Sequence, residues 1–331
     1  MPEKNQMALN DVEYKALPSG SHRVNQDFVY FRHGNKYGLA CLARANISNE
    51  DNTSAVSTVV PSQRGMCIKS VGIITSSIIH IQSYLQFLQA EAEIYLHQSP
   101  VNYDRLRGLL SHHDQPISLS PLIYETLFME FLHKFGPSIF PLSRLTLLGK
   151  RILLYSRSPI GSLCNAVYFL HLLNQSINPL FFVTIKDLPM LGEETSYIAC
   201  TTENIFQEKK STYDVFINCD DEVLFQTNDS SLQPIIKLTR NDRNRLKKPM
   251  TFNSFVNIGN RLSRLLDRLS KSSTHHEMTK EDFQSIQLHY RHDRLFISEY
   301  IRIHRIPHIT IAIPEFPFLP ISPCCSCPSV S

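Results

Sequence analysis

Three cysteines near the end of the chain, Cys324, Cys325 and Cys327, are the residues whose types and spacing most directly suggest chemistry. A structural zinc site needs four ligands at workable spacing, and no second pair of ligands accompanies these three. Cys324 and Cys327 also form a CxxC pair, but no βαβ context places it at the start of a helix, as redox chemistry would require. Two interpretations stay open: S-acylation of exposed thiols, which the surrounding prolines permit, and an inert tail.

The rest of the chain carries no complete motif of a catalytic, nucleotide-binding or metal-binding site. Gly149-Lys150 lacks the upstream glycine and the following Ser or Thr of a phosphate-binding loop. The pairs His112-His113 and His275-His276 lie in polar segments, with no Asp or Glu at ligand spacing, so neither pair is expected to bind a metal. The sequence contains no GxGxxG, HExxH, EF-hand loop or nucleophile elbow. We therefore expect no cofactor and no covalent catalysis, which favours a binding protein.

The composition is that of a globular protein of about two domains. Of the 331 residues, 42% are apolar and 19% are charged, and 33 Lys and Arg nearly balance 30 Asp and Glu, which argues against a dedicated nucleic-acid binder. The first residues are polar and the longest apolar runs are too short to cross a bilayer, so a cytoplasmic protein is expected. Reduced, mostly buried thiols are then expected at Cys41, Cys67, Cys164, Cys200 and Cys219.

The first hundred residues predict an antiparallel sheet that carries a helix. In "SGSHRVNQDFVYFRHGNKYGLACLARA" (19–45), two apolar runs flank a turn that contains Gly34, which is typical of a β-hairpin. Both faces of the first run are apolar, so its strand should be covered on both sides. "CIKSVGIIT" (67–75) predicts another strand, and apolar residues at spacings of three and four predict a helix from Ile78 to Tyr95.

Residues 120–240 predict a second unit, in which apolar strands alternate with helices. Strands are expected over 151–156, 178–185, 197–202 and 213–218, and helices over 123–135, 162–173 and 204–210. Strands separated by crossover helices indicate a parallel, largely buried sheet with helices on both faces. The fold class expected for the chain is therefore α/β.

The composition changes near Lys237. The segment "KLTRNDRNRLKK" (237–248) holds six basic residues and one acidic residue, which suits either a solvated linker or contact with an acidic surface. One Leu-rich helical face follows over 262–269. Prolines then interrupt the tail, so neither a stable helix nor a central strand is expected beyond Ile313.

Three long stretches occur in order along the chain: the hairpin segment followed by "SVGII" (70–74), "FGPSIFPLSRLTLLGKRILLYSRSPIG" (135–161) and "SYIACTTENIFQEKKSTYDVFIN" (196–218). Together they resemble the DENN-domain family and, within it, the branch called LCHN. The sequence departs from the family's pattern at three points. The apolar strand ahead of the hairpin is absent from the polar first residues, the helical third module is reduced to one clear helix, and the family's tryptophan ahead of the basic turn is missing.

The resemblance implies a bilobed DENN-type architecture. A longin-like N-terminal layer would be followed by a central doubly wound, mainly parallel sheet and a short helical part. The expected boundaries are 11–112 for the first lobe, 118–240 for the central lobe, 241–305 for the reduced helical module and 306–331 for the Pro/Cys-rich tail. With its first strand missing, the longin-like sheet would expose a hydrogen-bonding edge unless another segment covers it.

The resemblance also implies a function, because DENN domains generally act as guanine-nucleotide exchange factors for Rab-type small GTPases. It predicts a Rab-type partner and a role in membrane trafficking, with peripheral recruitment of the protein to endomembranes. An exchange-inactive scaffold or adaptor is the alternative. A third possibility is a small-molecule enzyme, which should show an apolar pocket with converging polar groups at the strand ends.

An exchange factor of this kind would bind the nucleotide-free GTPase through a wide surface across both lobes. Candidate contacts are Lys150, near the boundary between the lobes, and Arg157, Ser158 and Pro159, which follow a parallel strand at its carboxyl end. A tight turn is the structural alternative for the latter three. Contact with anionic lipid or an acidic GTPase face is the functional interpretation of Arg240, Arg243, Arg245, Lys247 and Lys248.

Overall fold

The computed structural model describes residues 9–46, 66–78, 81–97, 104, 121–247, 249–271 and 275–311. The tail cysteines Cys324, Cys325 and Cys327, the pair His112-His113 and Lys248 lie outside these ranges. The chain divides into two units, Met1–Arg261 and Leu262–Ser331.

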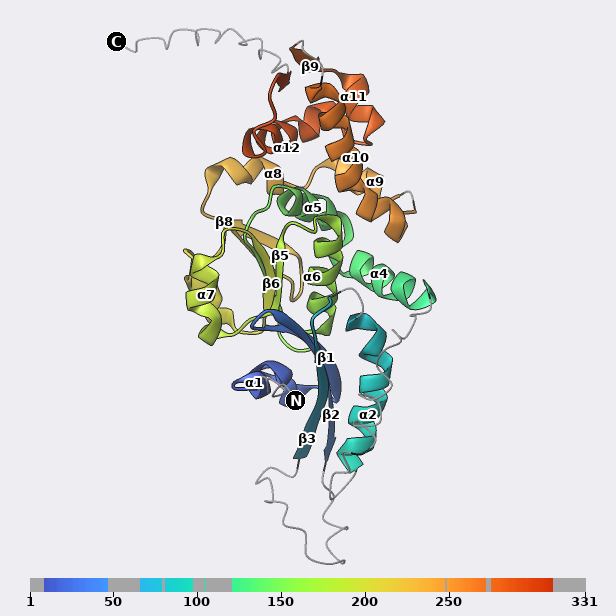
Figure 1. The fold of residues 1–331 in the computed structure, drawn as a ribbon, viewed down its shortest axis with the longest axis vertical. Helices are drawn as coiled ribbons and strands as arrows, with labels where there is room; N and C mark the ends of the chain where they lie inside the picture. The colour runs from blue at the N-terminus through green and yellow to red at the C-terminus, as the bar shows by residue number, and fades with distance from the viewer. Residues whose placement is uncertain are drawn as a thin grey trace, which may run out of the picture. The chain divides into compact units, whose positions relative to one another are not determined.

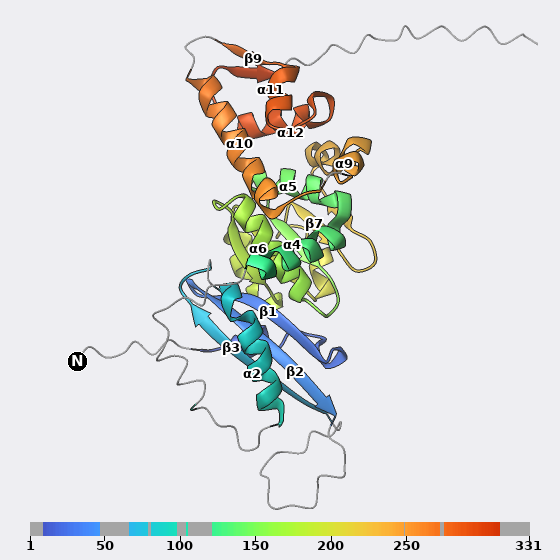
Figure 2. The same cartoon turned by 90° about the vertical axis from the view of Figure 1, so that its right-hand side faces the viewer.

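The first unit begins with the antiparallel sheet that the sequence predicts. Its strands are β1 (Gln26–His33), β2 (Lys36–Asn46) and β3 (Met66–Thr75), and β2 pairs with both neighbours. Helix α2 (Leu85–His97) packs on β2 and β3 (Figure 2), and the short helix α1 (Val12–Ala16) packs on β1. Val29, Tyr30 and Phe31 are at most 1% exposed, so β1 is covered on both faces as predicted.

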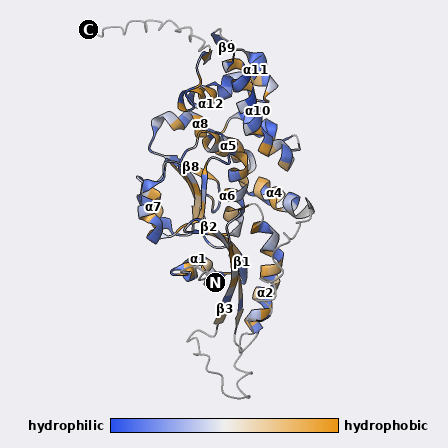
Figure 3. Cartoon of the chain, in the orientation of Figure 1, coloured by the Kyte–Doolittle hydropathy of each residue, from blue (hydrophilic) through white to orange (hydrophobic). Residues whose placement is uncertain are grey.

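A parallel sheet with helices forms the centre of the first unit (Figure 1). Its strands are β4 (Ile152–Tyr155), β5 (Asn178–Phe182), β6 (Tyr197–Thr201) and β7 (Val215–Asn218), and the antiparallel β8 (Leu224–Thr227) forms one edge. The helices are α4 (Pro121–Phe135), α5 (Ile139–Leu147), α6 (Gly161–Leu173), α7 (Leu188–Glu193), α8 (Gln233–Ile236) and α9 (Arg240–Arg245). The colouring in Figure 3 is predominantly hydrophobic along α5 and α6, which form much of the buried core.

The two sheets join edge to edge, in the order β3-β2-β1-β5-β6-β4-β7-β8. The joint is one antiparallel bridge between Phe31 and Phe181. The β5–β6 register shifts between Pro179 and Phe181, and Phe181 has φ 56°, a left-handed conformation that costs a bulky residue about 1–3 kcal/mol. The buried Phe181 ring contacts Tyr30 at 5.3 Å between ring centroids, so ring packing holds the strained backbone in place.

Helix α6 packs beside β1, next to the bridge with β5. The Asp27 carboxylate accepts hydrogen bonds from the backbone N–H groups of Ile160 and Gly161, at 2.7 and 3.0 Å. The Tyr30 N–H donates to Cys164 Sγ, in the next turn of the helix. A carboxylate at a helix N-terminus is also favoured by the helix dipole. Helix α6 therefore contacts β1 through both a side-chain and a backbone hydrogen bond.

Gly38 lies opposite Phe31 in the hairpin, and the aromatic ring covers it. A Cβ at this position would lie 2.2 Å from Cζ of Phe31, so we expect Gly38→Ala to destabilise the protein by about 1–3 kcal/mol through overpacking. Urea denaturation followed by circular dichroism would measure the change. Gly192→Ala, on α7 with nothing within 4 Å, is the matched control and should be neutral or slightly stabilising. A Gly38→Ala cost no larger than the control's would contradict this packing account.

A buried ion pair connects α5 with α9 in the first unit. Arg144 Nη2 lies 2.5 Å from Asp242 Oδ1, with the two side chains 6% and 0% exposed, and Arg144 Nη1 donates to the carbonyl of Ile235. Asp242 also completes a capping box with Thr239 at the start of α9. The basic segment thus forms a capped helix anchored in the core, which its composition did not predict.

Beyond Thr251 the structure contains more helix than the single Leu-rich segment that the sequence predicted. Helix α10 (Phe252–Ser270) ends in the second unit, where α11 (Lys280–Ser285), α12 (Tyr290–Ile303) and a parallel pair of strands, β9 (His276–Met278) and β10 (Ile309–Ile311), follow. The prediction of one helix was wrong because α11 is short and α12 carries a narrow apolar stripe, Phe296 and Ile297, among charged residues.

Five cysteines of the described residues are free thiols, as predicted. Cys41, Cys164, Cys200 and Cys219 are buried, whereas Cys67 is half-buried. Burial raises the pKa of the Cys219 thiol to about 12. Within the described ranges, no helix combines the length and apolar character needed to cross a membrane.

Candidate functional site

The four parallel strands end together at one edge of the central sheet. Tyr155, the last residue of β4, pairs with Thr201 of β6 and Asn218 of β7, and Phe182 of β5 pairs with Cys200. The loops that follow the strands therefore converge at this carboxyl edge, where open α/β sheets usually bind their ligands.

Three of the predicted contact residues lie at this edge, in the loop after β4. The Arg157 side chain is 71% exposed and pairs with Asp220 after β7, with 3.2 Å between Nε and Oδ2. Its backbone N–H donates to Oδ1 of the same carboxylate. Ser158 Oγ donates to the carbonyl of Ser19, and Pro159 is exposed. This loop therefore connects two strand ends of the central sheet with the segment that precedes the hairpin.

The loops after β5 and β6 bring part of the N-terminal segment to the same edge. Lys186 Nζ lies 3.6 Å from the centre of the Tyr14 ring and 2.7 Å from Asp11 Oδ1. Lys15 on α1 pairs with Asp187 at 2.9 Å. Helix α1 is thus fastened to the end of β5 through two lysines and an aromatic ring.

The charged groups at this edge influence one another. The hydrogen bond from Lys186 lowers the pKa of the Asp11 carboxyl and, from the same contact, Asp11 raises the pKa of Lys186. Burial raises the pKa of Glu203, although its carboxylate accepts a hydrogen bond from the Ile185 N–H. These charged groups thus pair with one another and with the backbone at this edge.

Large apolar side chains stand exposed along the same edge. They are Tyr14 on α1 (52% exposed), Ile185 after β5 (39%), Ile205 after β6 (52%) and Leu224 at the start of β8 (52%). We call these four residues, together with Arg157, the carboxyl-edge surface. Exposed apolar residues gathered beside charged ones mark protein interaction sites more often than isolated ones do.

Lys150 lies at the other end of β4 from Arg157. It follows α5, with its backbone N–H bonded to the carbonyl of Leu145, and it precedes the strand. The neighbouring Arg151 pairs with Asp214, with 2.9 Å between Nη2 and Oδ1, and donates to the carbonyl of Ser211, which fits a structural role. The structure thus separates Lys150 from Arg157, Ser158 and Pro159.

The predicted basic group lies on and just after α9. Arg240, Arg243 and Lys247 are exposed, whereas Arg245 is half-buried with its guanidinium 4.2 Å from the centre of the Phe140 ring. Their exposure leaves Arg240, Arg243 and Lys247 accessible to an acidic partner.

Sequence reasoning missed the apolar part of the surface. Ile185 and Ile205 each lie in a short 3₁₀ turn, Ile185–Asp187 and Asn204–Glu208. The sequence predicted that Ile185 ends the strand over 178–185 and that Ile205 lies in a helix over 204–210, so neither was identified as an exposed apolar residue. Only the alignment of the strand ends, however, reveals that the two lie at one edge.

Comparison with known proteins agrees with this architecture. A family model described as DENN domain-containing protein 11 matches residues 2–118 and 111–229. A DENN domain-containing protein 11 from Danio rerio is 34% identical over 277 residues, covering 72% of this chain and 54% of that protein. One from Rattus norvegicus is 33% identical over 276 residues, covering 72% and 57%. The late secretory pathway protein avl9 of Schizosaccharomyces pombe is 30% identical over 157 residues, covering 44% and 31%.

A mixed α/β sheet covered by helices, together with these matches, defines a DENN-type fold. The chain belongs to the DENN domain-containing protein 11 family. It spans about half the length of the DENN domain-containing protein 11 relatives.

Proposed function

We propose that this protein is a guanine-nucleotide exchange factor for a Rab-type small GTPase and that the GTPase binds at the carboxyl-edge surface. The observation that carries the proposal is the convergence of Tyr14, Ile185, Ile205 and Leu224, all exposed and apolar, at one edge of a DENN-type sheet. DENN-family proteins generally act on Rab GTPases, and the name of the avl9 relative places that protein in the late secretory pathway. We further propose that the chain belongs to the LCHN branch and acts in membrane trafficking.

Exchange on such a surface would require no bond chemistry. A tightly held nucleotide is bound to its GTPase with about 12–16 kcal/mol, so an exchange factor must offset much of that free energy. It does so when it binds the nucleotide-free GTPase better than the loaded form. The apolar side chains would supply contact area, and the Arg157–Asp220 and Lys186–Asp11 pairs would supply charged partners at the rim.

The exposed basic residues of the α9 segment support a second element of the proposal. Arg240, Arg243 and Lys247 would contact an acidic membrane surface and recruit the protein peripherally, with each cation contributing about 1 kcal/mol near such a surface. S-acylation at Cys324, Cys325 or Cys327 would strengthen the same recruitment.

Binding to different nucleotide states tests the proposal. A panel of Rab proteins would be immobilised with GDP, with a non-hydrolysable GTP analogue, or stripped of nucleotide with EDTA, and binding of the purified protein would be measured by interferometry. We expect at least one Rab to bind at least about tenfold more tightly when stripped, as an exchange mechanism demands. Equal affinity for all three states would favour the exchange-inactive scaffold, and no binding to any Rab would overturn the proposal.

A further inference from the structure

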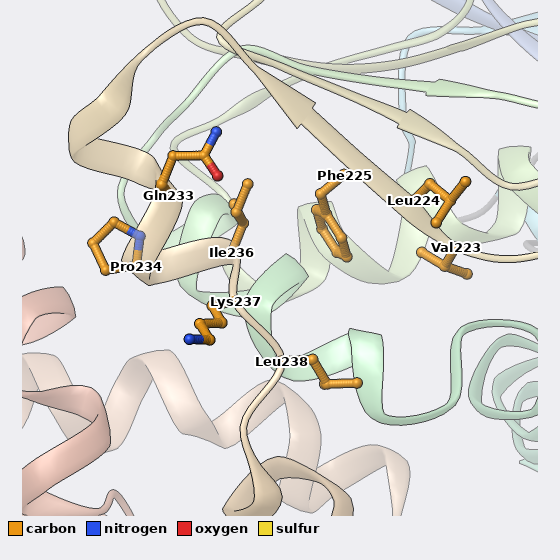
Figure 4. Close-up of a pocket in the computed structure, with 8 residues that line it drawn as sticks. All are labelled: Val223, Leu224, Phe225, Gln233, Pro234, Ile236, Lys237 and Leu238. Atoms are coloured by element: carbon orange, nitrogen blue, oxygen red, sulfur yellow. The ribbon is translucent and has the colours of Figure 1, made fainter.

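The outer edge of β8 borders an apolar groove. A cavity of about 480 Å³ lies between this strand and the α8 segment. Its lining residues are Val223, Leu224, Phe225, Gln233, Pro234, Ile236, Lys237 and Leu238. Figure 4 shows Phe225 on the strand and Ile236 and Leu238 on the facing segment, so apolar side chains line both walls.

The strand beside this groove has one partner among the described strands. β8 pairs with β7 in the register Val215–Thr227 to Asn218–Leu224, and it is the last strand in the sheet order. No proline or lysine interrupts its four residues, although these are the residues that commonly protect an exposed edge. Alternate backbone N–H and C=O groups of β8 therefore face outward, next to the groove.

Alternation of side chains connects the edge with the groove. Phe225 and Thr227 are half-buried, whereas Leu224 and Gln226 are exposed. A strand added beside β8 would continue the pleat, so every second side chain would lie on the face of Phe225, over the groove. An extended peptide could use the backbone edge for affinity and the groove for selectivity.

The charges near β8 indicate the chemistry of the partner. Residues 220–229, "DDEVLFQTND", hold four acidic residues and no basic one, with Asp221 and Glu222 exposed ahead of the strand and Asp229 exposed after it. A second copy of the chain, paired antiparallel at this edge, would bring acidic ends together, which disfavours self-association. Lys237 adds one cation on the far wall, where its methylene stem can line the groove.

We propose that the β8 edge and its groove form a docking site for an extended peptide segment of a partner protein, with alternating apolar side chains at its centre and basic residues at both ends. The acidic residues on both sides of β8 favour basic residues at the ends of the peptide, and the apolar walls of the groove favour apolar side chains at its centre. The proposal does not depend on exchange activity, although Leu224 belongs both to this groove and to the carboxyl-edge surface.

The test uses a synthetic peptide as the probe. Fluorescein-labelled KRVTVTVRK would be titrated with the purified full chain in an anisotropy assay, with EEVTVTVEE as the charge-reversed control. We expect saturable binding of the basic peptide below about 1 mM and none of the acidic peptide in the same range. Hydrogen exchange should slow at residues 224–227 when the basic peptide is bound.

Peptides with methylated backbone nitrogens distinguish binding by strand addition from binding by charge attraction alone. One peptide would carry N-methyl groups on its threonines and another on two of its valines. Since only alternate N–H groups of an added strand face β8, one methylated peptide should lose about tenfold or more in affinity and the other should lose little. Equal effects of the two methylations would overturn the proposal.

A pair of charge variants distinguishes the effect of the acidic residues beside β8 from the effect of the protein's net charge. Asp221→Lys combined with Glu222→Lys should weaken binding of KRVTVTVRK about tenfold. Glu125→Lys combined with Glu130→Lys on α4 makes the same change in net charge at exposed positions away from β8 and should leave binding unchanged. Equal losses in the two variants, or no saturable binding by the wild-type chain, would contradict docking at β8.

Discussion

Replacing Asp242 with alanine is expected to lower the free energy of unfolding by about 3–5 kcal/mol, because it leaves a buried guanidinium without its carboxylate. Arg144 is 6% exposed and lies 2.5 Å from Asp242, which is fully buried. The same substitution removes the capping box with Thr239, which contributes about 1 kcal/mol more. Urea denaturation, followed by far-ultraviolet circular dichroism, would measure the change.

A double variant distinguishes the cost of an unpaired charge from the value of the pair itself. Arg144→Met combined with Asp242→Leu removes both charges and fills the space, so its stability should lie much closer to that of the wild-type protein than does Asp242→Ala. Asp221→Ala, at an exposed position, is the control for loss of a carboxylate and should change stability by less than about 0.5 kcal/mol. If Asp242→Ala were as mild as Asp221→Ala, the ion pair would not anchor α9.

Replacing Asp27 with alanine is expected to destabilise the protein by about 2–4 kcal/mol, because buried backbone donors lose their acceptor. The Asp27 carboxylate accepts from the N–H groups of Phe28, Ile160 and Gly161 at 2.7–3.0 Å, and it joins β1 to the start of α6. The residue is only 9% exposed, so water cannot readily replace these bonds. Asp27→Asn keeps an acceptor oxygen and should cost less than Asp27→Ala in the same denaturation experiment.

The stability contributed by Asp27 should also depend on pH in a definite direction. Burial raises the pKa of Asp27 above its ordinary 3.8, and the backbone hydrogen bonds only partly offset that rise. Between 3.8 and the higher pKa of the folded protein, the folded state therefore binds more protons than the unfolded state. The contribution of Asp27 grows as pH falls through the folded pKa and shrinks as pH rises.

Asp27→Asn lacks this titration, so it provides the comparison. The stability advantage of the wild-type protein over Asp27→Asn should increase as the pH is lowered from neutral toward 3.8. Paired denaturation curves at several pH values would measure the difference. An advantage that shrank on acidification would show that the carboxylate, rather than the protonated acid, is the form favoured by folding.

The sequence predicted those helices and strands that have a clear local pattern of apolar residues. The hairpin of β1 and β2, the parallel strands and helix α6 follow from apolar runs and from helical spacing. Helix α5 was implied only by the family resemblance, because every one of its nine residues is buried and no polar face gives it a helical period. Helix α12 was not predicted for a different reason, since half of its residues are polar or charged.

The contacts that assemble the candidate site could not be predicted from local patterns. The bridge between Phe31 and Phe181 joins residues far apart in the chain, at a bulge where Phe181 has positive φ. Arg157, Ser158 and Pro159 were found because they follow a recognisable strand, but their neighbours Tyr14 and Ile205 come from other elements. The order of the strands in the sheet decides which loops meet at one edge, and local sequence patterns do not reveal that order.

The release of a fluorescent GDP analogue from Rab proteins tests the central claim most directly. The wild-type chain would be compared with Ile185→Asp/Ile205→Asp, which places two charges on the carboxyl-edge surface, and with Met129→Asp/Leu295→Asp, which charges two equally exposed positions on other elements. We predict that the wild-type chain and the second variant accelerate release from at least one Rab and that the first variant loses at least about tenfold of that acceleration, as for loss of central contacts. Acceleration that is the same for all three proteins, or absent from all three while each stays folded, would contradict the assignment of exchange activity to this surface.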